Sequence, residues 1–286
     1  MSIVQHHPRR FETNRYVYPV ISRRSGGLSV GVNLSPTGLC NFSCVYCQIL
    51  GEPEIKNSDS VLINVPKLET ELRNVLTAAN DGTLYANTYL SSTPPEKRVL
   101  RDIAFSGDGE PTLAVQFSEI VNRVADIRRE LCSAGTKIVL ITNGTTLNAV
   151  PVRNAVRVML DNNGEVWAKL DAGTPEMFRA VSRSRITFQK IVDNLTAAAK
   201  EFPLVIQSCF LMLHNEPPKE TDIERYADVL NSITNSGGTI QRVQIYTVAR
   251  STAEKWATPL SDDTLNTLTE IVRQRTGLQI AAFYSK

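Results

Sequence analysis

Short apolar runs alternate with amphipathic segments from about residue 28 onward, and this alternation constrains the fold more than any other feature. It is typical of strand and helix units repeated around a parallel sheet. The predicted strands are 28–34, 101–105, 137–142, 165–170, 203–212 and 241–248, with a short seventh at 278–284. We therefore expect an α/β protein, either an open doubly wound sheet or a partial (β/α) barrel. In both, the functional site lies in the loops after the strands.

Two of the intervening helices are supported by local signals. In residues 118–132, apolar side chains recur at helical spacing, and Ser118 is the predicted N-cap. In residues 261–276, Ser261 is the predicted N-cap and Gly277 the predicted end of the helix.

Composition excludes several classes of protein. The 286 residues are 42% hydrophobic and carry a net charge of +2, which excludes a disordered or collagen-like chain and leaves only a weak electrostatic footprint for nucleic acid. Residues 1–27 form a basic N-terminal extension rich in arginine, and residues 28–286 are expected to form a single core domain. Since the chain has no long apolar run and no secretory signal, we expect a cytoplasmic protein without a membrane partner.

Three of the five cysteines lie within eight residues. Cys40, Cys44 and Cys47 form a C-x3-C-x2-C motif directly after the first predicted strand, whereas Cys132 and Cys209 stand alone. An odd, clustered set of cysteines is not a disulfide framework. Three thiolates in one loop can each bind one iron of a [4Fe-4S] cluster and leave the fourth iron without a protein ligand.

The cysteine motif has two alternative interpretations, a zinc site and three unligated cysteines. Structural zinc requires four ligands, and His6, His7 or His214 could supply the fourth, but none is at a customary spacing. Three unligated cysteines would be reactive thiols in a polar loop, where packing offers them no role.

The motif around the cysteines, with Tyr46 before the third one, resembles the signature of the radical S-adenosylmethionine (SAM) superfamily. The segment after the second strand resembles the Gly-Gly-Glu-Pro segment of that family, and the exits of the third and fourth strands are also similar. The resemblance covers residues 28–250. It implies a partial (β/α)6 barrel of the radical SAM type, with a [4Fe-4S] cluster on Cys40, Cys44 and Cys47 and with SAM as the second cofactor.

The resemblance also implies the residues that contact SAM. No catalytic residue that acts on a substrate is indicated. The implied cofactor-binding residues lie at or near the ends of strands, with Tyr46 in the cysteine motif: Tyr46, Gly107, Asp108, Gly109, Glu110, Pro111, Asn143, Lys169, Asp171, Gln207, Ser208, Thr247 and Val248. Strand alternation places Lys169 and Asp171 on the face away from the helices, where a structural ion pair is the alternative interpretation. Gln207 and Ser208 fall on opposite faces, and the pattern does not say which one faces the site.

The activity implied is reductive cleavage of SAM to a 5′-deoxyadenosyl radical, which abstracts hydrogen from an unidentified substrate. The electron would come from a donor such as flavodoxin or ferredoxin. The sequence most resembles the tRNA wyosine-base synthases, but those enzymes carry a second cluster on three upstream cysteines, and no cysteine precedes Cys40. We therefore expect one cluster. The substrate stays open between a small molecule, a peptide and a nucleotide, with a tRNA-base-modifying enzyme and a non-catalytic metal-binding module as alternatives.

Overall fold

A computed structural model describes residues 11–48, 62–86 and 88–285, which divide into two compact units. Of the described residues, those within 1–40, 54–141 and 149–165 form unit 1, and those within 41–53, 142–148 and 166–286 form unit 2. The first boundary falls between Cys40 and Asn41, inside the cysteine motif. No linker-like composition in the sequence marks this division.

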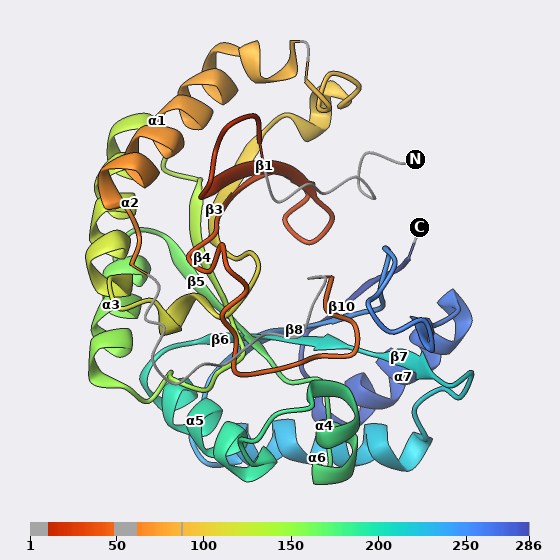
Figure 1. The fold of residues 1–286 in the computed structure, drawn as a ribbon. Coiled ribbons are helices and arrows are strands. Elements are labelled where there is room, and N and C mark those ends of the chain that lie inside the picture. The colour runs from red at the N-terminus through yellow and green to blue at the C-terminus, as the bar shows by residue number, and fades with distance from the viewer. Residues whose placement is uncertain (1–10, 49–61, 87, 286) are drawn as a thin grey trace. The chain divides into compact units, whose positions relative to one another are not determined.

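The sheet of unit 1 has the strand order β1-β2-β3-β4 (Figure 1). Its strands are β1 (Val17–Ser22), β2 (Gly27–Val32), β3 (Leu100–Phe105) and β4 (Lys137–Thr142). β1 is antiparallel to β2, whereas β2, β3 and β4 are parallel. β1 lies within the basic segment for which no strand was predicted.

A buried carboxylate explains how β1 is held. Glu71 in α1 (Val65–Asp81) accepts hydrogen bonds from the backbone N–H groups of Arg15, Tyr16 and Val17, at 2.9, 2.7 and 3.2 Å. Buried backbone donors need such partners, and here one side chain supplies them for the start of the strand. The first described residues are therefore part of the folded core of unit 1.

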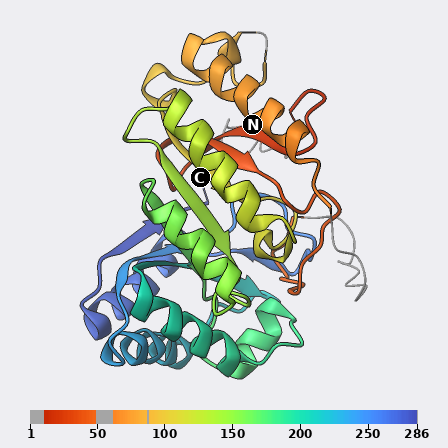
Figure 2. The same cartoon turned by 90° about the vertical axis from the view of Figure 1, so that its left-hand side faces the viewer.

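The helices of unit 1 lie side by side, α1 beside α2 (Phe117–Leu131) and α2 beside α3 (Val150–Leu160) (Figure 2). Three short 3-10 helices belong to the same unit: η1 (Thr83–Tyr85), η2 (Pro95–Lys97) and η3 (Pro111–Leu113). The predicted N-cap of α2 is wrong. The helix begins at Phe117, and the hydroxyl of Ser118 instead donates to the carbonyl oxygen of Pro151 at 3.1 Å.

The larger sheet of unit 2 has the parallel order β5-β6-β8-β10 (Figure 1). Its strands are β5 (Gly164–Lys169), whose first two residues belong to unit 1, β6 (Leu204–Cys209), β8 (Ile240–Tyr246) and β10 (Ile280–Phe283). β10 is the predicted short seventh strand. The predicted strand 203–212 divides into β6 and β7 (Leu211–Leu213), because β7 pairs antiparallel with β9 (Ala257–Pro259) in a second small sheet.

Four helices accompany these strands: α4 (Pro175–Ser182), α5 (Phe188–Glu201), α6 (Glu220–Asn235) and α7 (Asp262–Thr276), each packed on the next. Both predicted ends of α7 are confirmed. Ser261 accepts a hydrogen bond from the N–H of Thr264 at 3.1 Å, and Gly277 has a left-handed backbone. Among the described residues, no helix has both the length and the apolar character needed to cross a bilayer.

Candidate functional site

The three motif cysteines lie in an irregular loop after β2. Cys40 is the last residue of the first segment of unit 1, and Cys44 and Cys47 belong to unit 2. All three residues are partly exposed, as is Cys132, and none of them forms a disulfide, whereas Cys209 is buried. Burial raises the pKa of the remaining cysteine, Cys132, to about 11. The motif thiols are therefore accessible to a metal in a way that the thiol of Cys209 is not.

The unit 2 part of this loop is anchored to the end of α4. The N–H groups of Ser43 and Val45 donate to the carbonyl oxygens of Ser182 and Val181, at 3.0 and 2.9 Å. A further bond from the N–H of Cys47 to the carbonyl oxygen of Cys44, at 2.9 Å, closes a turn between the two cysteines.

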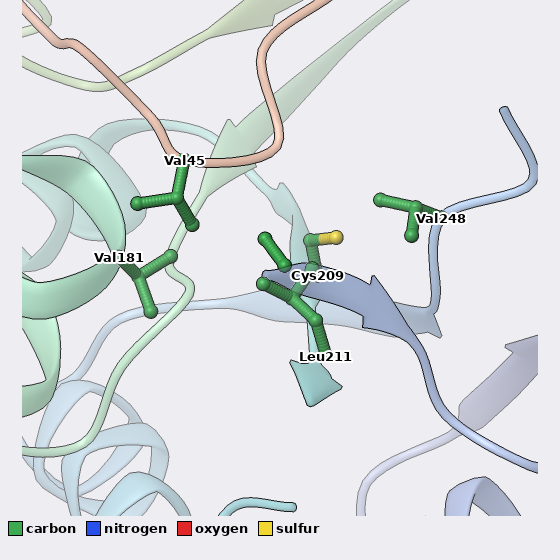
Figure 3. Packing of buried hydrophobic residues seen from close by; sticks show 6 residues of the cluster. Val45, Val181, Cys209, Leu211 and Val248 are labelled. Carbon is green, nitrogen blue, oxygen red and sulfur yellow. The ribbon is translucent and has the colours of Figure 1, made fainter. Parts of the chain in front are cut away.

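The side chain of Val45 adds an apolar anchor between the two cysteines. It is fully buried in a cluster that also includes Val181, Cys209, Leu211 and Val248 (Figure 3). Hydrogen bonds and apolar packing thus position the segment from Cys44 to Cys47 together.

Asn143, after β4, contacts the cysteine loop directly. Its amide Nδ2 donates to Oδ1 of Asn41 at 2.6 Å, and its own Oδ1 accepts from the N–H and hydroxyl of Thr145 at 3.1 and 2.8 Å. Asn41 in turn donates to the Thr145 hydroxyl at 2.8 Å. Asn143 therefore orients Asn41, the residue that follows Cys40, through a closed polar network.

The turn after β3 is held by close backbone contacts in unit 1. A Cβ atom at Gly107 would overlap the side chain of Asn33, and one at Gly109 would overlap the carbonyl oxygen of Leu39, so both positions require glycine. Asn33 donates to the carboxylate of Asp108 at 2.7 Å, and the N–H of Asp108 donates back to Asn33 at 3.2 Å.

Glu110 connects the same turn to the first cysteine. Its N–H donates to the carbonyl oxygen of Leu39, the residue before Cys40, at 3.1 Å. Its buried carboxylate accepts from the N–H and hydroxyl of Thr112, at 3.2 and 2.5 Å, and so caps η3, whose first residue is Pro111. The turn thus supports the backbone beside Cys40, and one oxygen of the Glu110 carboxylate has a structural partner.

Lys169 and Asp171 meet after β5 in a buried ionic network. Lys169 Nζ lies 2.8 Å from Asp171 Oδ1 and donates to the hydroxyl of Tyr246 at 2.5 Å. The other Asp171 oxygen accepts from the hydroxyl of Tyr46 at 2.5 Å, and Oδ1 also accepts from the N–H of Cys209 at 2.7 Å. Lys169 lies near the rings of both tyrosines, with Nζ 5.1 Å from the centroid of Tyr46 and 4.6 Å from that of Tyr246. The structure therefore contains the Lys169–Asp171 ion pair.

Burial and the charge of Asp171 together set the protonation of Lys169 and Tyr46. Burial alone would lower the pKa of Lys169, but the Asp171 carboxylate beside it raises that pKa above its ordinary value. Burial, reinforced by the Asp171 charge, raises the pKa of Tyr46 well above its ordinary value. At neutral pH, Lys169 is therefore charged and Tyr46 is a neutral hydrogen-bond donor.

Gln207 and Ser208 in β6 face opposite ways. Gln207 donates its amide to the side chain of Gln244 in β8 at 2.7 Å, and both are buried. The hydroxyl of Ser208 lies 2.5 Å from that of Tyr226 in α6, and therefore faces the helices.

Thr247 and Val248 follow β8 in the same unit. The hydroxyl of Thr247 accepts from the N–H of Leu260 at 2.9 Å. Val248 is part of the apolar cluster against which Tyr46 packs. The structure therefore brings Tyr46 near both Val248 and the Lys169–Asp171 pair.

The three motif cysteines suit an iron–sulfur cluster by their chemistry, although their side chains are not already arranged around a metal position. Within the described part of the chain, no three His, Cys, Asp or Glu side chains are grouped as a metal site. His214, one of the histidines weighed as a zinc ligand, stacks on Trp256 with ring centroids 4.4 Å apart, and His6 and His7 lie outside the described residues. Three uncrosslinked, accessible thiols in one loop match the three protein ligands of a cubane cluster.

Several residues that shape the site were not predicted as site residues. Asn33, Asn41 and Tyr246 each contact a predicted residue. The sequence offered one indication of their role, which is that each is a polar residue within or next to a motif or strand end. Their partners lie far away in sequence, so no local pattern could pair them.

This chain is similar to several known proteins. A family model described as the radical SAM superfamily matches residues 34–227. A Brachyspira hyodysenteriae protein named GTPase Obg is 24% identical over 256 residues, which are 89% of this chain and 33% of that protein. A Helicobacter pylori protein named UPF0026 protein is 25% identical over 249 residues, covering 86% of this chain and 70% of that protein. The crystal structure of archaeal TYW1 is similar over 88% of this chain and 73% of that chain, with a TM-score of 0.46 and 13% identity.

Proposed function

This chain belongs to the radical SAM superfamily, and on that premise we propose that it binds a [4Fe-4S] cluster through Cys40, Cys44 and Cys47 and cleaves SAM reductively. The α/β fold class predicted from the sequence is confirmed. The observation that carries the proposal is the set of three accessible, uncrosslinked thiols in the loop after β2. The chain spans only a third of the Brachyspira relative, so that protein's activity is not transferred.

When bound and reduced, a [4Fe-4S] cluster would supply the single electron needed to cleave SAM to methionine and a carbon radical able to take a hydrogen atom from the substrate. The electron enters from a separate one-electron donor, such as a flavodoxin or a ferredoxin. The chain's own residues hold the ligands in place. The bond from Glu110 to Leu39 fixes the backbone before Cys40, and buried Val45 fixes the backbone between Cys44 and Cys47.

The polar groups after the strands are suited to SAM. Carbonyl oxygens of the turn from Gly107 to Pro111 can accept from the methionyl ammonium, since glycine lets a ligand approach the backbone closely. Charged Lys169 can pair with the SAM carboxylate, and Asp171 can accept from a ribose hydroxyl. Each of these two interactions would replace a partner within the buried network.

The remaining contacts concern the ribose and the adenine. Between the two candidates in β6 we favour Gln207 for the ribose, because Ser208 faces α6. Tyr46 and the backbone of Thr247 and Val248 are suited to the adenine. We assign Asn143 to orienting Asn41 in the cysteine loop. The substrate is proposed only as a small molecule, peptide or nucleotide, tRNA included.

Anaerobic reconstitution with iron and sulfide tests the proposed function. The wild-type chain should bind about four irons, show visible cluster absorbance, and form 5′-deoxyadenosine from SAM with dithionite. Cys44→Ala should abolish the cluster and the product, because it removes one of three protein ligands. Cys132→Ala is the matched control and should retain both. Binding of one zinc and no iron, with no 5′-deoxyadenosine, would refute the proposal.

A further inference from the structure

Arg183, the residue after α4, has an unusual backbone for its type. It adopts the left-handed conformation, with φ +46° and ψ +41°, at a helix end where glycine is the usual residue. A side chain at such a position strains the backbone, so its presence invites a search for what the side chain contacts.

The guanidinium of Arg183 joins two loops of unit 2. Its Nε donates to the carbonyl oxygen of Ser43, the residue before Cys44, at 2.7 Å. Its Nη1 donates to Oε1 of Glu254 at 2.6 Å. Glu254 lies in the segment between β8 and β9, and its neighbour Ala253 donates its N–H to the carbonyl oxygen of Cys47 at 3.1 Å. The cysteine segment is therefore held on both sides, before Cys44 and at Cys47.

The segment that presents Glu254 is itself braced. The hydroxyl of Thr252 lies 2.8 Å from the carbonyl oxygens of both Glu254 and Ala257. The ion pair is partly shielded, since the side chain of Arg183 is 39% exposed and that of Glu254 is 29% exposed. Arg179, one turn earlier in α4, instead pairs with Glu176 in an ion pair whose side chains are 69% and 75% exposed, and its guanidinium contacts lie within its own helix.

We propose that Arg183 and Glu254 are positioning residues that clamp the segment from Ser43 to Cys47 between the end of α4 and the loop after β8. The planar guanidinium suits this task because its donors point in fixed directions and can bind a carbonyl and a carboxylate at once. The role rests on the proposed function, since the clamp matters for catalysis only when Cys44 and Cys47 bind the cluster. Through this clamp, the backbone conformation of the segment from Ser43 to Cys47 depends on the position of the loop after β8.

The variant Arg183→Gly distinguishes the loss of the clamp contacts from a loss of overall stability. Glycine relieves the strain of the left-handed backbone, and this gain offsets the loss of both side-chain contacts, so the unfolding temperature should stay close to that of the wild type. In the reduced, metal-free chain, mass spectrometry of alkylated peptides would measure how fast Cys44 and Cys47 react. We expect alkylation about fivefold faster in Arg183→Gly and in Glu254→Ala, with Cys132 unchanged.

A second readout uses the reconstituted protein. Arg183→Gly should release iron to a chelator about fivefold faster than wild type. Arg183→Lys should restore only part of the protection, because an ammonium lacks the rigid fork. Arg179→Gln, the matched control on the same helix, should match wild type in both assays.

The clamp is wrong if Arg183→Gly leaves the alkylation rates of Cys44 and Cys47 within twofold of wild type. The proposal is also wrong if the alkylation rate of Cys132 rises by the same factor, because the substitution would then have destabilised the whole protein and not only the cysteine segment. If the wild type binds no iron, the proposed function fails, and the alkylation rates still decide whether the clamp exists.

Discussion

Asp102 in unit 1 and Asp171 in unit 2 are both buried carboxylates, but the two units give them different partners. Asp102, in β3, accepts from the hydroxyl of Ser29 at 2.5 Å, and burial raises its pKa despite the neighbouring hydroxyls and the charge of Arg24. Asp171, just after β5, contacts an ammonium, a phenol and a backbone N–H. A direct cation partner thus distinguishes the carboxylate at the strand end of unit 2.

The two buried carboxylates differ in whether a cation lies in direct contact with them. Burial disfavours the charged form of a carboxyl, and a cation in direct contact opposes that effect. In unit 1, the predicted cofactor-binding turn instead depends on backbone contacts at glycine. The two units should therefore respond differently to charge removal and to added volume, and two carboxyls within unit 1 should respond to pH in opposite directions.

The largest effect is expected from Asp171→Ala. The substitution leaves Lys169 charged, buried and without its carboxylate, which should lower the free energy of unfolding by about 3–5 kcal/mol. Denaturant titration of the wild type and variant measures the loss. Glu176→Ala, which breaks an exposed ion pair in the same unit, is the control and should change stability by no more than about 0.5 kcal/mol. A loss below about 1 kcal/mol for Asp171→Ala would mean that the network is not coupled as described.

Gly109→Ala should have the next largest effect, in unit 1. The new Cβ would overlap the Leu39 carbonyl oxygen, so the backbone beside Cys40 must shift, and we expect a loss of about 1–3 kcal/mol. Iron content after reconstitution should also fall, because Leu39 precedes the first cysteine. Gly135→Ala is the control, since the nearest atom to its Cβ is 3.9 Å away. Equal stability of the two variants would show that the turn is not tightly packed.

The smallest expected effect is the contribution of Asp102 to the pH dependence of the free energy of unfolding. A carboxyl with a higher pKa in the folded state binds its proton more tightly there, so the free energy of unfolding falls as pH rises from about 3.8 through the raised pKa. Asp102→Asn removes this contribution. The stability of Asp102→Asn relative to wild type should therefore increase over that pH window, as measured by denaturation at a series of pH values.

Asp81, also in unit 1, should change the free energy of unfolding with pH in the direction opposite to Asp102. Hydrogen bonds from the hydroxyl and N–H of Thr83 lower the pKa of Asp81, so its stabilising contribution is present at neutral pH and is lost as pH falls through the lowered pKa. Asp81→Asn should therefore lose stability relative to wild type as pH rises. Slopes of the same sign in the two variants would contradict the interpretation of Asp102.

The parallel strands were predictable to within a few residues, because buried strands are nearly continuous apolar runs whose ends are marked by polar residues. The predicted strand 137–142 coincides with β4. β1 was missed because it lies in an arginine-rich segment and depends on Glu71, more than fifty residues away. The predicted cap at Ser118 failed because Ser118 has a partner in α3 that no local pattern reveals.

The sequence by itself determined the spacing of the three cysteines, the order of strands and helices, and the face of β5 that carries Lys169. These features depend on backbone periodicity and on neighbouring residues, which a linear pattern records. Only the tertiary structure decided that Tyr46 binds Asp171, that Ser208 faces α6 and that Arg183 reaches Ser43 and Glu254. Those choices depend on packing between segments far apart in the chain, where a short-range pattern carries no information about the partner.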